Sequence, residues 1–137
     1  MIAKAATISH GGNAVRYSVN KDKAEIVKVN FLPDDISAEA MYQRMVLKQK
    51  EFASTINKGR PLKRNVIRME ISPTKEESAG WTLDDWVRLA NEYIQIFDSI
   101  DLSKKAKRAS AKCTNVRNSQ YIVALHHDAK SGIPHLH

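Results

Sequence analysis

The order of hydrophobic and polar residues along the chain predicts several short strands. Side chains of a strand point alternately to its two faces, so a half-buried strand alternates apolar and polar residues. The segment 65–72 alternates in this way from Val66 to Ile71. Apolar and β-branched runs predict further strands over residues 1–9, 24–31 and 121–125.

Two longer segments have the periodicity of helices that bury one face. Ser37 is suited to cap a helix that runs to about residue 56, with one apolar face formed by Met41, Met45, Phe52 and Ile56. Thr82 and Asp85 have the spacing of a capping box, and Trp81 is placed to pack on Trp86. The stripe of this second helix, expected in the core, is Trp86, Leu89, Ala90, Tyr93, Ile94 and Phe97.

The remaining segments connect these elements. Residues 10–13 contain two glycines and predict a turn after the first strand, and the segment around Tyr17 that follows is compatible with a helix. Residues 101–119 are polar and basic and lead to a final hairpin. Strands that are interspersed with helices and end in a hairpin predict a single α+β domain over residues 1–137.

Composition narrows the environment and the kind of partner. The chain has 137 residues, of which 42% are hydrophobic, and this is enough for one domain with a core. No apolar run approaches the roughly 20 residues of a membrane span. The single cysteine, Cys113, excludes an internal disulfide framework and fits a reducing cytoplasm. A net charge of +7 favours a polyanion such as nucleic acid as the partner.

Basic residues gather in two clusters that are the expected phosphate contacts. The first is Lys58, Arg60, Lys63 and Arg64, and the second is Lys104, Lys105, Lys107 and Arg108. Contacts of this kind give a salt-dependent affinity that is largely independent of base sequence. Each cluster is equally compatible with a solvated loop that binds nothing.

Four of the five histidines lie in the last twelve residues. His135 and His137 are two positions apart, so in a strand their imidazoles point to the same side. A turn separates them from His126 and His127, which follow the strand 121–125. Because neighbours in a strand point to opposite faces, at most one of these two joins the pair. Three imidazoles predict a metal site, and such a donor set suits zinc, copper, nickel or manganese.

Three motifs, in this order, resemble the relaxase (mobilisation nuclease) family of His-hydrophobe-His endonucleases. The first is the strand and glycine turn before Tyr17, in the segment 13–21. The second is the segment 64–73, which resembles a middle strand that ends in a serine, Ser72, near the DNA. The third is the pattern His126-x-Asp128 followed by Pro134-His135-x-His137. The resemblance covers the whole chain and implies a central antiparallel sheet with packed helices.

This resemblance implies a nuclease activity for the chain. Tyr17 is then the nucleophile that nicks single-stranded DNA at a transfer origin and forms a 5′-phosphotyrosyl intermediate, so that a plasmid or mobile element is mobilised. The metal ligands are His126, His135 and His137, with His127 as the alternative to His126, and Asp128 and Ser72 support the site. The expected ion is Mg²⁺ or Mn²⁺. Other expected partners are accessory mobilisation proteins, in the cytoplasm of a bacterium.

The family's domains continue past the strand that bears the last two histidines. We therefore expect this chain to be a relaxase domain truncated at its last motif strand, with uncertain activity in this form. A strand that is cut at a functional residue is prone to fray. An unpaired neighbouring strand edge also favours self-association.

Two alternative functions stay open at this point. Rolling-circle replication initiators share the tyrosine and His-hydrophobe-His chemistry, and the position of Tyr17 ahead of the histidines argues for a relaxase instead. A non-catalytic basic DNA-binding module with a structural metal is the other alternative. Replacement of Tyr17 by Phe separates these cases, because only a nuclease loses strand cleavage while it still binds DNA.

Overall fold

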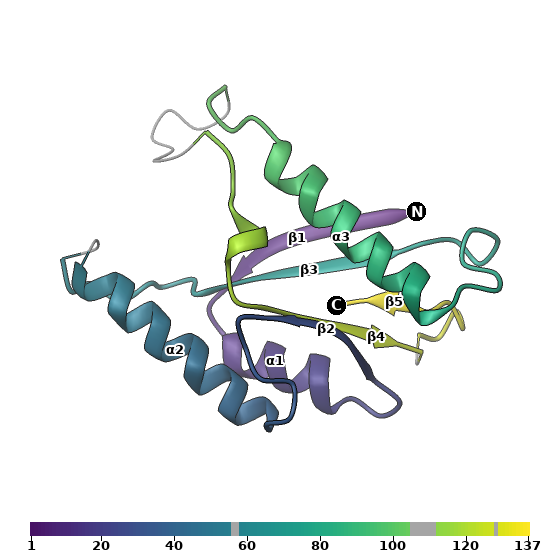
Figure 1. Cartoon of the computed structure of the whole chain (residues 1–137), viewed down its shortest axis with the longest axis horizontal. Coiled ribbons are helices and arrows are strands. Elements are labelled where there is room, and N and C mark those ends of the chain that lie inside the picture. The colour runs from purple at the N-terminus through teal and green to yellow at the C-terminus, as the bar shows by residue number, and fades with distance from the viewer. Residues whose placement is uncertain (56–57, 105–111, 128) are drawn as a thin grey trace.

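The computed structural model describes residues 1–55, 58–104, 112–127 and 129–137. The strands are β1 (Ile2–Ile8), β2 (Glu25–Asn30), β3 (Val66–Ser72), β4 (Tyr121–His126) and β5 (His135–Leu136). The helices are α1 (Gly11–Asn20), α2 (Ala38–Thr55) and α3 (Leu83–Ser99), with a 3₁₀ turn, η1, at Val116–Asn118 (Figure 1). The prediction of an α+β fold is therefore confirmed.

The strands form one five-stranded sheet in the order β1-β3-β5-β4-β2. Every pairing is antiparallel, as the resemblance implied. The first strand pairs along its full length with β3, from Ile2 opposite Ser72 to Ile8 opposite Val66. The last strand, β5, lies in the centre between β3 and β4, so the end of the chain is inserted into the middle of the sheet.

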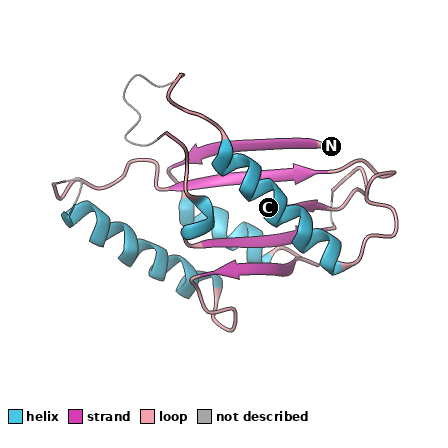
Figure 2. Cartoon of the chain, turned by 45° about the horizontal axis from the view of Figure 1, so that its top comes forward, coloured by secondary structure: helices cyan, strands magenta, loops and turns pink. Residues whose placement is uncertain are grey.

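Helices cover both faces of the sheet (Figure 2). On one face, α3 packs through Trp86 and Ala90 on a core that includes Ile71, Leu125 and Leu136. On the other face, α1 and α2 share a second core, formed by the buried side chains of Val15, Ala38 and Met41 with Val29 and Ile122 of the sheet. The sheet is thus the middle layer of three.

The start of α3 follows the predicted capping chemistry. The Asp85 carboxylate accepts hydrogen bonds from the backbone N–H of Thr82 at 2.8 Å and from its hydroxyl at 2.9 Å. These bonds, the backbone one foremost, lower the pKa of the Asp85 carboxyl. The rings of Trp81 and Trp86 meet edge to face with centroids 4.8 Å apart. Local sequence therefore fixes where this helix begins and which face it buries.

Two details differ from the sequence predictions. Residues 10–13 do not form a separate turn, because Gly11 and Gly12 are the first residues of α1, which carries Tyr17 on its surface. Phe52 was expected in the core but is 41% exposed, since α2 extends beyond the sheet surface that covers its first turns. The predicted core position Ile56 lies outside the described residues.

Close packing at the start of α1 explains why residue 11 is a glycine. A Cβ added to Gly11 would lie 2.5 Å from Val66 Cγ2 and 2.9 Å from Tyr42 Cε2. The three atoms nearest to a Cβ on Gly12 would all belong to the Tyr42 ring, at 3.0 Å or more. Without a side chain at Gly11, α1 can lie directly against both β3 and α2.

We expect Gly11→Ala to destabilise the protein by about 1–3 kcal/mol, the range typical of an overpacked core. Urea unfolding measures this change. Gly12→Ala is the matched control, and it should cost less because the flexible Tyr42 ring can move aside. Equal losses for the two variants would show that helix propensity at this end of α1, and not the contact with Val66, determines the effect.

Candidate metal and tyrosine site

The hairpin of β4 and β5 brings the C-terminal histidines together. His126 lies opposite His135 in the pairing of the two strands. His137 follows two residues later, and its backbone N–H and C=O both bond to Ala124, each at 2.8 Å. Directly opposite residues share a face, and so do residues two apart, so all three imidazoles point to the α1 side of the sheet.

The three rings form a compact cluster. Ring centroids are 4.4 Å apart for His126 and His137, 5.0 Å for His135 and His137, and 5.6 Å for His126 and His135. One ring nitrogen from each lies within 4.8 Å of the others. Two nitrogens bound to one ion at about 2.0–2.1 Å lie at most about 4.2 Å apart. Small ring movements therefore bring all three nitrogens within reach of one metal ion.

Backbone carbonyls fix the tautomers of two of these histidines. The Nε2 of His126 is 2.9 Å from the carbonyl oxygen of Ser18, one of the last four carbonyls of α1. The Nδ1 of His135 is 3.3 Å from the carbonyl oxygen of Ile133. Since a carbonyl only accepts, each of these nitrogens carries the proton. The other nitrogen of each ring, Nδ1 of His126 and Nε2 of His135, keeps the lone pair that binds a metal.

His137 differs from His126 and His135 in that, among the described residues, no backbone carbonyl contacts either of its ring nitrogens. Among the described residues, neither of its buried ring nitrogens has a hydrogen-bond partner. Burial, together with repulsion from His126 and His135, lowers the pKa of His137 to about 4. The imidazole is therefore neutral at pH 7 and offers a lone pair inside a cluster of like donors. Buried polar groups without partners are rare, and a bound metal ion would satisfy this one.

Tyr17 reaches the same cluster from α1. Its ring centroid is 5.4 Å from those of both His126 and His137, and the side chain is 45% exposed. The ammonium group of Lys21, one helical turn further along the chain, donates to the Tyr17 hydroxyl at 3.2 Å and lies 4.4 Å from the ring centroid. Tyr17 is therefore partly exposed, with its ring against two of the histidines and its hydroxyl paired with a cation.

The structure distinguishes the two candidates for the third histidine. His126 is completely buried beside His135 and His137, whereas His127 is exposed and its Nε2 lies 4.0 Å from the carboxylate of Glu25. The two histidines differ because neighbouring residues in an extended segment point to opposite faces of the sheet. Asp128 lies outside the described residues. Ser72 is the last residue of β3, and the pairing of Ile71 with Leu136 puts it next to His135 in the register.

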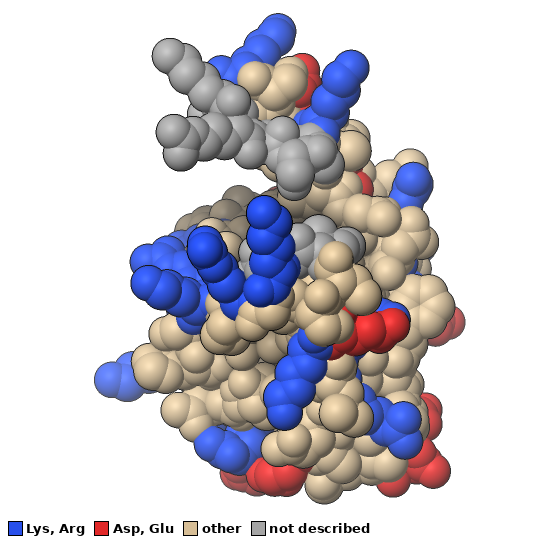
Figure 3. Space-filling view, turned by 90° about the vertical axis from the view of Figure 1, so that its left-hand side faces the viewer, with Lys and Arg blue, Asp and Glu red and all other residues tan. Residues whose placement is uncertain are grey.

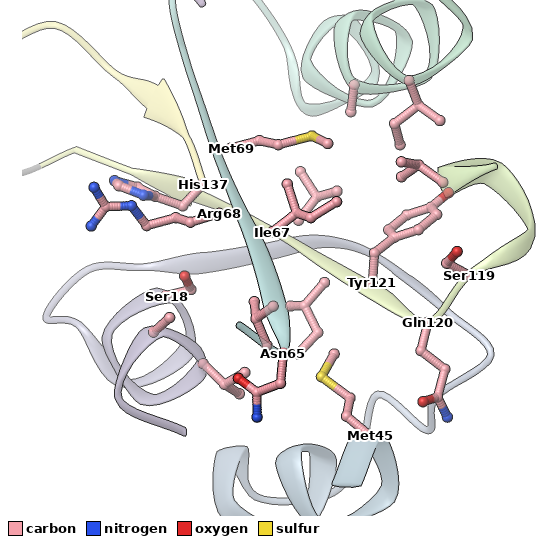
Figure 4. Close-up of a pocket in the computed structure, with 18 of the residues that line it drawn as sticks. Ser18, Met45, Asn65, Ile67, Arg68, Met69, Ser119, Gln120, Tyr121 and His137 are labelled. Atoms are coloured by element: carbon pink, nitrogen blue, oxygen red, sulfur yellow. The ribbon is translucent and has the colours of Figure 1, made fainter. Parts of the chain in front are cut away.

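Three charged residues near the cluster were not singled out from the sequence. Arg68 and Glu70 are close enough to His137 to act on its charge, Glu70 favouring and Arg68 opposing the protonated form. Figure 4 shows Arg68 and His137 on the same side of β3. The sequence feature that could have identified Arg68 and Glu70 is the alternation in β3, which places both side chains on the same face of the strand as Ser72. The feature that could have identified Lys21 is its position four residues after Tyr17, a spacing that brings two side chains together at one side of a helix.

The first basic cluster lies at the far end of β3. Lys58, Arg60, Lys63 and Arg64 precede Val66, whereas the histidines lie beside Ser72, so about 20 Å of strand separates the two groups. Figure 3 shows lysine and arginine side chains gathered on the side of the molecule where α2 ends. Lys104 is exposed after α3, and Lys105, Lys107 and Arg108 lie outside the described residues.

Comparison of the chain with protein-family models, with curated proteins and with solved structures finds no match. Within the described part of the chain, no helix has both the length and the apolar character needed to cross a bilayer.

Proposed function

We propose that this chain is a relaxase-type nuclease domain that nicks single-stranded DNA with Tyr17. The observation that carries the proposal is that Tyr17 lies 5.4 Å, centroid to centroid, from two members of a three-histidine cluster. The tyrosine and the histidines come from opposite ends of the chain. A histidine cluster alone fits a structural metal, but an exposed phenol beside it fits nucleophilic chemistry on a phosphate.

The reaction is a transesterification. Tyr17 Oη forms a bond to phosphorus while the bond from phosphorus to the 3′ oxygen breaks. The phenol proton leaves to solvent and the 3′ oxygen gains a proton, so the products are a 5′-phosphotyrosyl strand and a free 3′-hydroxyl. Because the phosphodiester is exchanged and not hydrolysed, the strand can be rejoined. The Lys21 ammonium group, which donates to Oη at 3.2 Å, would stabilise the phenolate as it develops.

The donor set also indicates which ions fit. His126, His135 and His137 would hold a divalent cation, which supplies positive charge for a non-bridging phosphate oxygen. Three neutral nitrogen ligands suit manganese, zinc, nickel or copper, whereas magnesium prefers oxygen ligands. Of the two ions that the resemblance implies, the site therefore favours Mn²⁺ over Mg²⁺.

The expected substrate is single-stranded DNA at a transfer origin. A net charge of +7 and the basic cluster Lys58, Arg60, Lys63 and Arg64 support a polyanionic ligand that extends beyond the site. Mobilisation of a plasmid or mobile element in the bacterial cytoplasm, with accessory mobilisation proteins, is the cellular role that follows from the resemblance.

The direct test is formation of a covalent adduct. The chain is incubated with Mn²⁺ and a pool of single-stranded oligonucleotides that includes DNA flanking its own gene, and its intact mass is measured. A mass increase equal to that of a 5′-phosphorylated fragment less one water, as expected for a phosphotyrosyl ester, supports the proposal. Salt-sensitive DNA binding with no adduct at any sequence in the pool would favour the non-catalytic binding module.

We expect Lys21→Gln to slow adduct formation by about tenfold or more while DNA affinity changes little. The reason is the loss of the cation that contacts Tyr17 Oη. Lys23→Gln, two residues away with the same change of charge, is the control. An equal loss of rate in both variants would show that Lys21 acts only through general attraction of DNA.

A further inference from the structure

Among the described residues, Phe31 has the most exposed large hydrophobic side chain. It follows the last residue of β2 and is 68% exposed. Its φ of 53° lies in the left-handed region, which a bulky residue rarely adopts and which glycine adopts without strain. An exposed ring adds little to the core, and strained residues of this kind cluster at functional sites. The position therefore indicates a binding role for the ring.

The backbone beside Phe31 is held by the side chains of its neighbours. Asn30 Nδ2 donates hydrogen bonds to the carbonyl oxygens of Arg117, at 3.1 Å, and Ser119, at 2.8 Å. Gln120 Nε2 donates to the carbonyl oxygen of Phe31 at 3.4 Å. These bonds join the end of β2 to η1 and to the residue that precedes β4. The backbones of Phe31 and Arg117 are thus held side by side.

A carboxylate on α3 also fixes η1. Asp98 accepts a hydrogen bond from the Thr114 hydroxyl at 2.6 Å. It accepts two more from the backbone N–H groups of Val116, at 2.8 Å, and Arg117, at 3.0 Å. The Arg117 side chain is exposed, and its guanidinium favours the ionised form of Asp98 but forms no hydrogen bond or ion pair with a described residue. An accessible cation therefore projects from a fixed backbone next to Phe31.

Phe31 and Arg117 lie on the basic side of the molecule. Asn30 pairs with Tyr121, at the opposite end of β4 from His126. Phe31 is therefore about 20 Å from the histidine cluster, at the usual rise per residue of a strand. The first basic cluster lies at the same end of the sheet, because β3 and β4 run in the same direction. Figure 1 places η1 and this end of β2 on the side that faces the viewer in Figure 3, where lysine and arginine side chains gather.

We propose that Phe31 and Arg117 form a binding platform for single-stranded DNA, in which an unpaired base stacks on the Phe31 ring and Arg117 binds a neighbouring phosphate. Every base has a π-face, so this platform accepts any sequence. A duplex keeps its bases stacked on one another, so the platform favours single strands. The inference rests on the proposed function for its ligand, single-stranded DNA, but not for cleavage by Tyr17.

The surroundings of the ring fit a nucleic acid better than a protein partner. The centre of a protein interface is apolar, whereas Leu32 beside Phe31 is buried and the other side chains next to the ring in sequence or through hydrogen bonds are polar. Asp34 and Asp35, in the loop that leads to α2, repel phosphates. The DNA backbone is therefore expected on the Arg117 side of the ring.

The first test replaces the ring by the residue that suits the backbone. Phe31→Gly is expected to weaken binding of a fluorescently labelled oligothymidylate, measured by anisotropy, by about fivefold or more, which corresponds to the loss of one stacked base. The urea midpoint should stay the same or rise, because glycine relieves the left-handed strain. Affinity for an abasic oligonucleotide of the same length should be unchanged. Ile96→Ala, which truncates a 64% exposed side chain on α3, is the control and should change neither affinity.

Two further variants test the two contacts separately. Phe31→Trp should keep the affinity of the unchanged chain for oligothymidylate, and the added tryptophan fluorescence should be quenched by this oligonucleotide but not by the abasic one. Arg117→Gln should weaken binding of both oligonucleotides, and the slope of log affinity against log salt should fall by about 1.

The outcomes separate this proposal from the nicking activity. Equal affinity of Phe31→Gly and the unchanged chain for oligothymidylate, with normal adduct formation in both, would overturn the platform alone. Loss of affinity in Phe31→Gly, with no adduct from either chain, would support the platform and count against the nuclease. No binding of single-stranded DNA by the unchanged chain would overturn both. Self-association that Phe31→Gly abolishes without a change in DNA affinity would assign the ring to an interface between copies and overturn the platform.

Discussion

Tyr17→Phe is expected to reduce covalent DNA adduct formation by about 10³-fold or more, to below detection in an intact-mass assay. Phenylalanine keeps the ring that lies against His126 and His137 but removes the oxygen that attacks phosphorus. Tyr17 is 45% exposed and the substitution keeps its ring, so folding should be little affected. Affinity for single-stranded DNA should also be retained, because the basic residues that attract phosphates are unchanged.

Tyr93→Phe is the matched control for this prediction. Tyr93 lies on α3, away from the histidines, and burial raises the pKa of its hydroxyl, so it is a poor nucleophile. The control variant should form adduct at the rate of the unchanged chain. If Tyr17→Phe also forms adduct normally, another nucleophile carries the reaction and the assignment of Tyr17 is wrong. If the unchanged chain binds DNA but forms no adduct, both variants are uninformative and the binding-module reading is favoured.

The second large effect is expected on metal affinity. His137→Ala should weaken Mn²⁺ binding by at least about 100-fold, measured by isothermal titration calorimetry, because it removes one of three nitrogen donors. The unchanged chain should gain about 2.7 kcal/mol in stability when the free ion is at 100 times its Kd. The variant should lose most of this gain. Zn²⁺ offers a second probe, since the same donors suit it.

His127→Ala separates a specific site from general ion binding by histidines. His127 is adjacent to His126 in sequence but is exposed and lies outside the cluster. The metal affinity of this variant should equal that of the unchanged chain. Similar losses for His127→Ala and His137→Ala would contradict the three-histidine site and would reopen the choice between His126 and His127.

The two predictions report on different parts of the site. Loss of adduct in Tyr17→Phe with normal Mn²⁺ binding would separate the nucleophile from the metal ligands. His137→Ala is expected to lose both metal affinity and adduct, since the cation supplies charge for the phosphate. A variant that binds Mn²⁺ weakly but forms adduct at the normal rate would show that the cluster holds a structural ion.

Much of the local structure could be predicted from the sequence. The alternation in 65–72 and the apolar run 121–125 correspond to β3 and β4, and the capping residues Thr82 and Asp85 begin α3. The parity of His135 and His137 was sufficient to place both imidazoles on one face. These features depend on periodicities of two and 3.6 residues and on caps, which act between residues close in sequence.

Other features depended on contacts between distant segments. The sequence did not determine that β5 would lie in the centre of the sheet or that His126 and not His127 would join the cluster. Nor did it determine that α1 would bring Tyr17 against the cluster, with Lys21 on the Tyr17 hydroxyl. Residues 10–13 have the composition of a turn, yet packing of α1 against Val66 and Tyr42 made their glycines the start of a helix. Sequence patterns report which face of each element is apolar, and only packing in three dimensions decides which faces meet.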